Sequence, residues 1–380
     1  MDSISIYPQR LKGTFAIPPS KSQTMRALIF ASKAQSPSKI KNLLDSPDTN
    51  AMINALSKLG ASIANGQVTP HPWTLPKEPI DAGNSGQVYR FIRALAPVEI
   101  VGDTSIMTRR PIQPLLDGLE QLPNAHIDGA DSQPVSGLLM AMAFRDGVST
   151  LRVDNPGEKP WVGMTLSWFD RLGITYTNEN YKKYTVTGPA KFPGFTYTVP
   201  ADFSSAAFPW ALQQLGHDIT LSGLCPDPAQ GDAKFLTLDP LAGGIIDVND
   251  IIDSIPILAV LGCFAKSPLT LFNGAIARKK ESDRISAITK ELRKMGAHIE
   301  EHEDGLTAYP STLHGANLDS DADHRVSMSL IVAALNATSP STLTGTACIA
   351  KSYPNFIKEV MRCSSYTDRP ALEKAHLANV

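Results

Sequence analysis

One pattern recurs along this chain and constrains its fold more than any other feature: an amphipathic segment that ends at a turn and continues into a short β-like stretch. Apolar residues in each copy fall at i, i+3, i+4 and i+7, the period of a helix with one buried face. Gly60, Gly173 and Gly296 stand where a left-handed cap would end three of these helices. The four copies are residues 52–63, 114–127, 164–176 and 288–299.

The spacing of these copies indicates a larger repeated α/β unit. They lie about 50 to 120 residues apart, too far for a helical solenoid. Because one hydrophobic core seldom grows past about 250 to 300 residues, a chain of 380 residues is expected to form two domains. Breaks marked by proline at residues 16–20 and 198–202 are candidate crossings between them, with ordinary surface turns as the alternative.

Charge and cysteine content exclude several classes of protein. The 35 Lys and Arg residues nearly balance 37 Asp and Glu residues, so a dedicated nucleic-acid-binding protein is not expected. The four cysteines form no CxxC or Cys/His cluster, which argues against a zinc site and for reduced thiols. The longest apolar run, residues 255–265, is too short to cross a bilayer. We therefore expect a cytoplasmic protein with no metal, cofactor or membrane partner.

Basic and small polar residues gather in six short stretches. In the first, residues 18–26, a small-residue turn opens a predicted helix, and Lys21 and Arg26 add charge suited to an anion, although the P-loop pattern GxxxxGK[ST] is absent. In the second, residues 83–90, glycines permit close backbone approach to a ligand and Arg90 opens a predicted helix. Any one of these stretches could simply be a solvent-exposed surface segment. Only the order of all six along the chain is specific. The other four are residues 109–111, 278–284, 323–325 and 351–354.

Taken together, these stretches resemble the 5-enolpyruvylshikimate-3-phosphate (EPSP) synthase family over nearly the whole chain. The resemblance is carried by PPSKSQTMRA, GNSGQVYR, RRPI, SQPVSGLLM, ADFSSAA, KKESDR, DHR and KSYPNF, which occur in the order of the family's motifs.

The resemblance implies a two-domain, inside-out α/β barrel, the enolpyruvyl transferase fold. Each domain would contain repeated βαβαββ units, some of them truncated, with helices inside and strands outside. The first domain would comprise residues 19–200, and the second residues 1–18 and 201–380. The active site would lie in the cleft between them.

The implied reaction is transfer of the enolpyruvyl group of phosphoenolpyruvate to the 5-hydroxyl of shikimate-3-phosphate, with release of phosphate. This reaction belongs to the shikimate pathway, which leads to chorismate and the aromatic amino acids. Both substrates are small polyanions, so the site needs fixed cations. The addition also needs one proton removed from the hydroxyl and one delivered to the methylene carbon. The resemblance implies no metal or cofactor, and we expect a monomer.

The same resemblance assigns roles to individual residues. Lys21 would contact both substrates, Asp253 would accept the hydroxyl proton beside Lys280, and Glu281 would handle the proton at the methylene carbon. Shikimate-3-phosphate would be bound by Lys21, Ser22, Arg26, Ser132, Gln133, Asp253 and Lys280, with Ser22 and Arg26 on its carboxylate. Phosphoenolpyruvate would be bound by Lys21, Gly86, Arg110, Gln133, Arg284, Arg325 and Lys351, with Arg284 and Arg325 on its carboxylate.

Some positions depart from the family pattern. Asp131 and Glu158 stand where the family commonly has serines that meet the acceptor's phosphate, although chlamydial-type members carry similar variants. Since a carboxylate repels a phosphate, we expect both acids to turn outward or pair with a cation, leaving Ser132, Lys280 and backbone donors to the phosphate. In addition, Trp161 replaces a tyrosine and Ile276 an asparagine.

Two alternatives to this function stay open. One is a different acceptor, such as an unphosphorylated cyclohexene acid. The other is a catalytically reduced paralogue that binds anions without turnover, because the repeats look trimmed before Ser132 and around residues 65–80 and 232–247. A UDP-N-acetylglucosamine enolpyruvyl transferase is disfavoured, since residues 102–111 lack the reactive-loop cysteine.

Overall fold

The computed structural model describes residues 3–225 and 229–364. Contacts divide the chain into two compact units, which are described separately. Unit 1 has the limits Met1–Pro18, Ala201–Pro226 and Asp232–Val380, and unit 2 has the limits Pro19–Pro200 and Asp227–Gly231. None of the described helices is long and apolar enough to span a membrane.

A complete βαβαββ repeat is formed by residues 124–188 of unit 2. Strands β8 and β9 are parallel and joined through α5, and β10 and β11 form an antiparallel hairpin, giving the sheet order β10-β11-β9-β8. The elements are β8 (Asn124–Asp128), α5 (Ser132–Phe144), β9 (Gly147–Asp154), α6 (Lys159–Leu172), β10 (Tyr176–Glu179) and β11 (Lys183–Gly188).

Two further sheets repeat this topology. In unit 1 the sheet order is β14-β15-β17-β16, and in unit 2 it is β12-β3-β5-β4, where β12 comes from far along the chain and takes the place of the first strand. The unit 1 elements are β14 (Gly244–Asp247), η4 (Asn249–Ser254), α8 (Ile255–Cys263), β15 (Leu269–Phe272), η5 (Ala275–Lys279), α9 (Arg284–Lys294), β16 (Ile299–His302) and β17 (Gly305–Ala308). The unit 2 elements are α1 (Lys21–Lys33), β3 (Ser38–Lys41), α2 (Pro47–Lys58), β4 (Ser62–Ala64), β5 (Gln67–Thr69) and β12 (Thr196–Thr198).

The remaining repeats are shorter, with sheets β6-β7, β1-β19-β18 and β13-β2. Each still contains a parallel strand pair, so the shortening removes outer strands and keeps the strand-helix-strand core. In unit 2 these elements are β6 (Ile80–Asp81), η1 (Val88–Ile92), α3 (Arg93–Leu95), β7 (Ile100–Val101), η2 (Ser105–Arg109) and α4 (Gln113–Gln121). In unit 1 they are β1 (Ser3–Ile6), β2 (Lys12–Ala16), α7 (Phe203–Gln214), β13 (Asp218–Ser222), η3 (Gly231–Thr237), β18 (Asn317–Asp319), α10 (His324–Leu335), β19 (Ser341–Thr344), η6 (Thr346–Lys351) and α11 (Phe356–Arg362).

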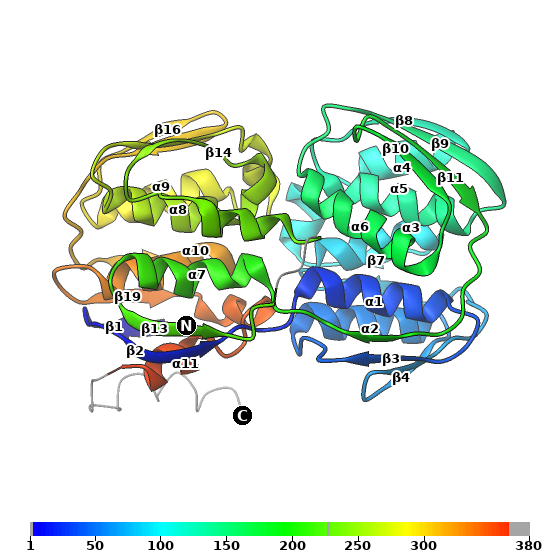
Figure 1. Ribbon diagram of the computed structural model, residues 1–380, viewed down its shortest axis with the longest axis horizontal. Helices are drawn as coiled ribbons and strands as arrows, with labels where there is room; N and C mark the ends of the chain where they lie inside the picture. The colour runs from blue at the N-terminus through cyan, green and yellow to red at the C-terminus, as the bar shows by residue number, and fades with distance from the viewer. Residues whose placement is uncertain (1–2, 226–228, 365–380) are drawn as a thin grey trace. The chain divides into compact units, whose positions relative to one another are not determined.

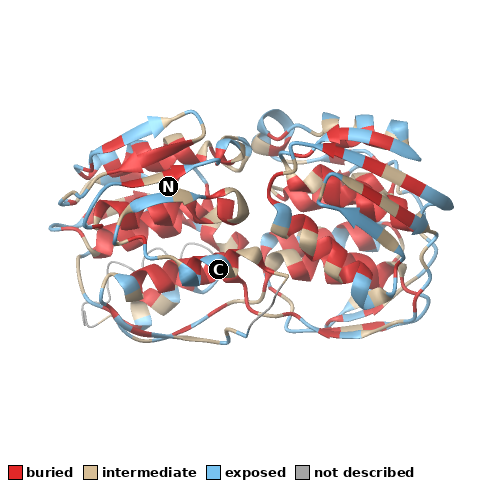
Figure 2. Cartoon of the chain, turned by 45° about the horizontal axis from the view of Figure 1, so that its top comes forward, coloured by how far each residue is buried: buried red, intermediate tan, exposed pale blue. Residues whose placement is uncertain are grey.

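Within each unit the helices lie inside and the strands outside. In unit 2, helices α1, α2, α5 and α6 lie between strands β3 and β4 on one side and β8 to β11 on the other (Figure 1). The same layering in unit 1 places α7 to α10 between β14 and β16 and the strands β1, β2, β13 and β19 (Figure 1). Figure 2 shows the helices mostly buried and the strands alternating between buried and exposed residues. Every residue of α8 and of α10 is buried. The predicted inside-out α/β architecture is confirmed.

The four repeated segments form the predicted helix-to-strand transitions. They contribute α2 and β4, α4 and β8, α6 and β10, and α9 and β16. Gly173 caps α6 in the left-handed conformation with φ of 68°, and Gly60 and Gly296 also have positive φ values. One local prediction is wrong: Arg90 does not open a helix, because the helical segment already begins at Gly86 and contains a π-helical turn at Val88–Ile92.

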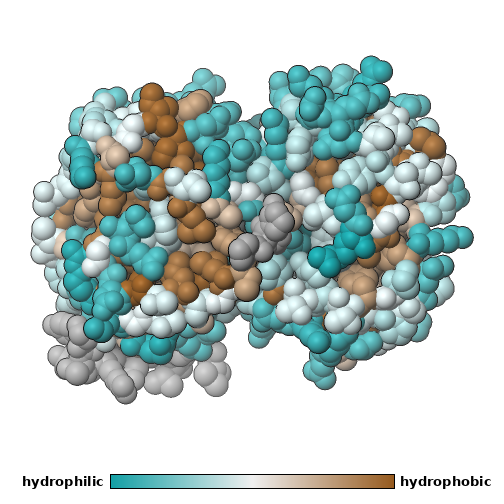
Figure 3. Space-filling model, viewed as in Figure 1, coloured by the Kyte–Doolittle hydropathy of each residue, from teal (hydrophilic) through white to brown (hydrophobic). Residues whose placement is uncertain are grey.

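Polar residues cap the first helix of several repeats. Ser20, Asp131, Asp202 and Asp323 accept a backbone N–H at the starts of α1, α5, α7 and α10. The surface in Figure 3 is mainly hydrophilic to neutral, interrupted by hydrophobic areas. Exposed large apolar side chains include Leu75, Met107 and Ile245. The chemistry-bearing residues gather at the capped helix ends rather than on this outer surface.

Candidate active site

The predicted site residues fall into two clusters, one in each unit. Most lie at or just before the N-terminal ends of helices, where backbone N–H groups and the helix dipole favour anions. The α1–α5 cluster, in unit 2, comprises Lys21, Ser22, Arg26, Gly86, Arg110, Ser132 and Gln133. The α9–α10 cluster, in unit 1, comprises Asp253, Lys280, Glu281, Arg284, Arg325 and Lys351.

Lys21 and Ser22 form the first turn of α1. The Lys21 ammonium lies 3.4 Å from Oδ2 of Asp48, a buried carboxylate in the first turn of α2. The Ser22 hydroxyl accepts a hydrogen bond of 3.1 Å from the side-chain amide of Gln87. Sequence reasoning missed Asp48, although the string Ser46-Pro47-Asp48 is a helix start signal that places an acid in the first turn.

Arg26 is a buried cation that hydrogen-bonds only neutral groups of the described chain. Its Nε donates to the Thr165 hydroxyl at 3.0 Å, and Nη2 donates to the Trp161 carbonyl at 2.8 Å. The third donor, Nη1, reaches the Ser22 carbonyl at 3.1 Å. Burial lowers the pKa of this guanidinium, because the charged form loses hydration without gaining a counter-ion. An anionic group brought next to Arg26 would therefore be stabilised.

Three polar side chains converge on Gly86. Arg90 donates from Nη1 to the Gln133 amide oxygen at 2.8 Å, and Arg110 approaches the Asn84 carbonyl at 3.4 Å. A Cβ atom at position 86 would lie 3.0 Å from the Gln133 oxygen and 3.1 Å from a nitrogen of each arginine. The absence of a side chain at Gly86 is what allows these groups to meet. Arg90, which was not among the predicted ligands, links this group to Asp131, because Nη2 lies 3.3 Å from its Oδ2.

The two acids that depart from the family pattern both lie at the start of α5. Asp131 caps α5 and forms an ion pair with Arg90, so it is paired with a cation. Glu158 does not turn outward: it is 1% exposed, and its Oε2 accepts both the backbone N–H and the hydroxyl of Ser132 at 3.0 Å. The reason is a tight turn that packs Gly157 against Ala130 and brings Glu158 to the start of α5. Glu158 therefore holds donors that were expected to stay open for a phosphate.

Arg284 is the hub of the α9–α10 cluster. Its three nitrogens donate to three carboxylates: Nε to Asp323 at 2.8 Å, Nη1 to Asp253 at 2.6 Å and Nη2 to Glu281 at 2.8 Å. Burial alone would lower the pKa of Arg284, but the three acids raise it well above its ordinary value. Asp323, which also accepts from Ser282 and caps α10, positions this arginine. The string DHR contained this acid, but its partners lie about 40 residues away in the sequence and could not be assigned.

Asp253 is shared between two guanidinium groups. One carboxylate oxygen accepts from Arg284 and the other accepts from Nη2 of Arg325 at 3.0 Å. Burial opposes ionisation of this group, yet Arg325, Arg284 and Lys280 hold the pKa of its carboxyl far below the ordinary value. Among the described residues, Nε and Nη1 of buried Arg325 have no hydrogen-bond partner. The cluster therefore contains an ionised acid beside guanidinium N–H groups able to receive an anion.

Glu281 and a second acid complete this cluster. The Lys351 ammonium donates to Oε1 of Glu281 at 2.7 Å, while the other oxygen of Glu281 meets Arg284. The buried Asp232, missed from the sequence, accepts a hydrogen bond from Ser204. Burial and the charge of Asp253 raise the pKa of Asp232, so this acid is kept protonated more readily than its neighbour.

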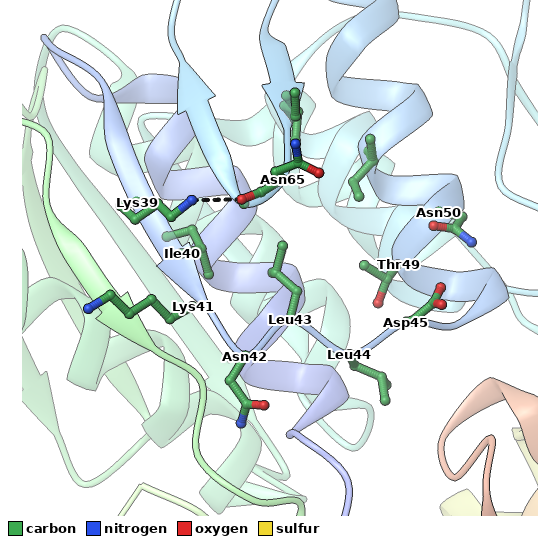
Figure 4. A pocket seen from close by; sticks show the side chains of 14 residues that line it. Lys39, Ile40, Lys41, Asn42, Leu43, Leu44, Asp45, Thr49, Asn50 and Asn65 are labelled. Carbon is green, nitrogen blue, oxygen red and sulfur yellow. Dashed lines mark hydrogen bonds between the residues drawn. The ribbon is translucent and has the colours of Figure 1, made fainter.

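The pocket drawn in Figure 4 is a separate feature of unit 2. It has a volume of about 530 Å³ and lies among β3, the following turn, the start of α2 and the β4–β5 hairpin. The Lys39 ammonium, at its rim, donates to the Asn65 carbonyl at 2.8 Å. Its lining contains none of the predicted site residues. The candidate site thus rests on the two clusters and not on this pocket.

Comparison with solved structures identifies the fold. The fold matches an EPSP synthase from Acinetobacter baumannii with a TM-score of 0.78, covering 96% of this chain and 98% of that chain at 24% identity. It also matches the enolpyruvyl transferase NikO from Streptomyces tendae with a TM-score of 0.73, covering 95% and 97% of the two chains at 17% identity. At these identities the likeness establishes the enolpyruvyl transferase fold.

Sequence comparison then identifies the family. The family model described as EPSP synthase (3-phosphoshikimate 1-carboxyvinyltransferase) matches residues 6–132, 124–242 and 237–360. The 3-phosphoshikimate 1-carboxyvinyltransferase of Chlamydia caviae is 40% identical over 415 aligned residues, with 94% of this chain and 93% of that protein covered. That of Chlamydia pneumoniae is 40% identical over 413 residues, with the same coverage. The chain belongs to the EPSP synthase family.

These alignments also bear on the trimmed repeats. Both are longer than the 380 residues of the chain itself, so each relative carries residues that this chain lacks. Despite this shortening, both clusters contain their full set of predicted side chains.

Proposed function

We propose how the two clusters of this chain perform the reaction of its family. The chain is an enzyme of the transferase class, and its function is the synthesis of 5-enolpyruvylshikimate-3-phosphate in the shikimate pathway. The enolpyruvyl group passes from phosphoenolpyruvate to the 5-hydroxyl of shikimate-3-phosphate, and phosphate leaves. The observation that carries this function is a family match running from residue 6 to residue 360, which takes in every residue of both clusters.

The α1–α5 cluster would hold the shikimate ring and part of phosphoenolpyruvate. Buried Arg26 lacks a carboxylate among its hydrogen-bond partners, and Ser22 lies on the same helix, which supports a role in binding the shikimate carboxylate. Lys21 would contact both substrates, and Ser132 would reach the acceptor. Gly86, Arg110 and Gln133 would hold phosphoenolpyruvate, a role supported by their convergence at one point.

The α9–α10 cluster would supply the proton transfers and bind the carboxylate of phosphoenolpyruvate. The two unpartnered nitrogens of Arg325 support its role as a ligand of that carboxylate, with Arg284 beside it and Lys351 close by. Glu281 would then handle the proton at the methylene carbon of phosphoenolpyruvate.

Substrate binding would also activate Asp253. Without substrate, Asp253 is a weak base. Burial raises the pKa of its carboxyl, but the positive charges of Arg325, Arg284 and Lys280 lower it by more. An anionic carboxylate bound to the two arginines would offset their charge, and the pKa of Asp253 would rise. Phosphoenolpyruvate would thereby make Asp253 a better acceptor for the 5-hydroxyl proton.

The direct test of function is phosphate release in the presence of both substrates. We expect release only when phosphoenolpyruvate and shikimate-3-phosphate are both present, with a product of the mass of 5-enolpyruvylshikimate-3-phosphate. Binding of both substrates without release would support the catalytically reduced paralogue. Release with shikimate but not with its phosphate ester would show that the acceptor differs.

Replacing Gly86 with alanine is expected to weaken phosphoenolpyruvate binding selectively. The added Cβ would displace the tips of Gln133, Arg90 and Arg110 by a few tenths of an ångström. We expect KM for phosphoenolpyruvate to rise about tenfold and KM for shikimate-3-phosphate to rise less, because Gln133 is the only displaced side chain that is also assigned to shikimate-3-phosphate. Steady-state kinetics with each substrate varied would measure this. Gly163→Ala on α6, where the Cβ would meet only the Tyr181 hydroxyl at 3.4 Å, is the matched control.

We also propose that the enzyme works in the cytoplasm on small-molecule substrates, as a monomer. The location is supported by its four cysteines, Cys225, Cys263, Cys348 and Cys363, all of which carry free thiols. Measuring the molar mass in solution tests the oligomeric state.

A further inference from the structure

The N-terminus of α5 is already occupied by two carboxylates of the chain itself. The backbone N–H and the hydroxyl of Ser132 both donate to one oxygen of Glu158 at 3.0 Å. The next N–H, that of Gln133, donates to Asp131 at 3.0 Å. These are the donors with which the start of a helix binds an anion. An incoming anion would meet groups that are already satisfied.

The position of Glu158 is imposed by the backbone around it. Gly157 donates to the Gly129 carbonyl at 3.0 Å, and a Cβ on Gly157 would lie only 2.7 Å from the Ala130 carbonyl oxygen. Glu158 itself has φ of 46° and ψ of 40°, a left-handed conformation that residues with a side chain rarely adopt. Such a conformation persists only where the surrounding structure holds it, and it is typical of functional positions. The turn therefore aims the carboxylate at α5, where it is 1% exposed.

Asp131 and Glu158 bind different donors at the start of α5. Asp131 keeps its usual capping role and has Arg90 as a counter-ion 3.3 Å away. Glu158, in contrast, reaches across 26 residues of sequence and takes both donors of Ser132. Under the proposed function, Ser132 reaches the phosphate of the acceptor. Glu158 and that phosphate thus compete for the same two hydrogen bonds.

We propose that Glu158 is an internal competitor for the phosphate of the acceptor and so determines how strongly the enzyme prefers a phosphorylated over an unphosphorylated acceptor. This inference rests on the proposed function. In the free enzyme the carboxylate of Glu158 fills the start of α5, and it releases Ser132 when the phosphate arrives. A carboxylate and a phosphate dianion cannot share these donors, because like charges repel and each donor hydrogen serves one acceptor well. The competition lowers affinity for the phosphate ester and leaves affinity for unphosphorylated shikimate largely unaffected.

The test compares Glu158→Gln with wild type by isothermal titration calorimetry, using shikimate-3-phosphate and shikimate as separate ligands. Glutamine keeps the length of the side chain and a carbonyl oxygen for Ser132, and it removes only the charge. Since hydrogen bonds to a charged group are worth much more than those to a neutral one, we expect shikimate-3-phosphate to bind about tenfold more tightly or better. The affinity for shikimate should stay within about twofold of wild type. Glu179→Gln is the control, because Glu179 is an exposed acid on β10 of the same unit, paired with Lys183.

Several outcomes would overturn the inference. Unchanged or weaker binding of shikimate-3-phosphate by folded Glu158→Gln would show that Glu158 does not compete. Weaker binding of shikimate would show that Glu158 is itself a ligand of the acceptor. Glu158→Ser, which also removes the bulk of the side chain, provides a second variant, and melting temperatures confirm that each protein is folded. Wild-type phosphate release with both substrates tests the proposed function separately, since the inference concerns only the ratio between variant and wild-type affinities.

Discussion

Lys21→Met is expected to reduce turnover by at least about 100-fold while leaving the fold intact, because loss of one preorganised charged donor from a dry site has an effect of this size. Lys21 forms the first turn of α1 and, like Gln133, is assigned to both substrates. Its side chain is 13% exposed, and methionine has a similar length and can fill the same space. Phosphate release under saturating substrates, together with the melting temperature, would measure the two effects. Retention of more than about a tenth of the activity would contradict a direct role in the reaction.

The ion pair between Lys21 and Asp48 requires a control variant. Asp48 is 4% exposed and lies 3.4 Å from the Lys21 ammonium, so the single variant leaves a buried carboxylate without this cation. Removing a partner from such a pair costs stability, on the order of 1 to 3 kcal/mol. The double variant Lys21→Met, Asp48→Asn removes both charges. We expect the double variant to regain the wild-type melting temperature and to stay inactive. Recovered activity would show that the single variant lost turnover because Asp48 was left without its cation.

Much of the fold could be predicted from the sequence because its local signals agree with the tertiary structure. The apolar period of residues 164–172 and the turn at Gly173 specify α6 and its end without reference to the rest of the chain. The same agreement between period and turn predicts α9 and Gly296. The pairing of β12 with β3 could not be predicted, because it joins segments more than 150 residues apart and neither strand carries a specific signal for the other.

The residues predicted for the candidate site gather in two clusters, but the sequence did not predict how their side chains pair. The motifs named both the acids and the cations of the α9–α10 cluster, yet the sequence did not indicate that Arg284 joins three carboxylates. Glu158 shows why. Its direction depends on a left-handed backbone conformation and on contact between Gly157 and Ala130, which arise from the packing of two loops. Charge repulsion led us to expect that Glu158 would turn outward or pair with a cation, and its hydrogen bonds to Ser132 could not be foreseen from the sequence.

Asp253→Asn and Glu281→Gln are each expected to lower kcat by about 100-fold to 10,000-fold with much smaller effects on substrate affinity, the range typical of lost general acid or base catalysis. In the first variant, the asparagine would retain an acceptor oxygen for one arginine but could not take a proton. In the second, the glutamine would retain a hydrogen-bonding partner for Lys351. These conservative changes separate proton transfer from binding better than alanine, which would leave Arg284 and Arg325 with unpaired charge.

The direction of the change in phosphoenolpyruvate affinity distinguishes the role of Asp253 from simple ligand binding. Asp253 competes with the substrate carboxylate for Arg284 and Arg325, to which it is bound at 2.6 Å and 3.0 Å. Removing its charge should therefore leave phosphoenolpyruvate affinity unchanged or increase it, even as kcat falls. Calorimetry with each substrate, beside single-turnover rates, measures both effects. If Asp253→Asn instead mainly weakens binding of shikimate-3-phosphate and turns over at the wild-type rate once saturated, Asp253 holds the acceptor and another group removes its proton.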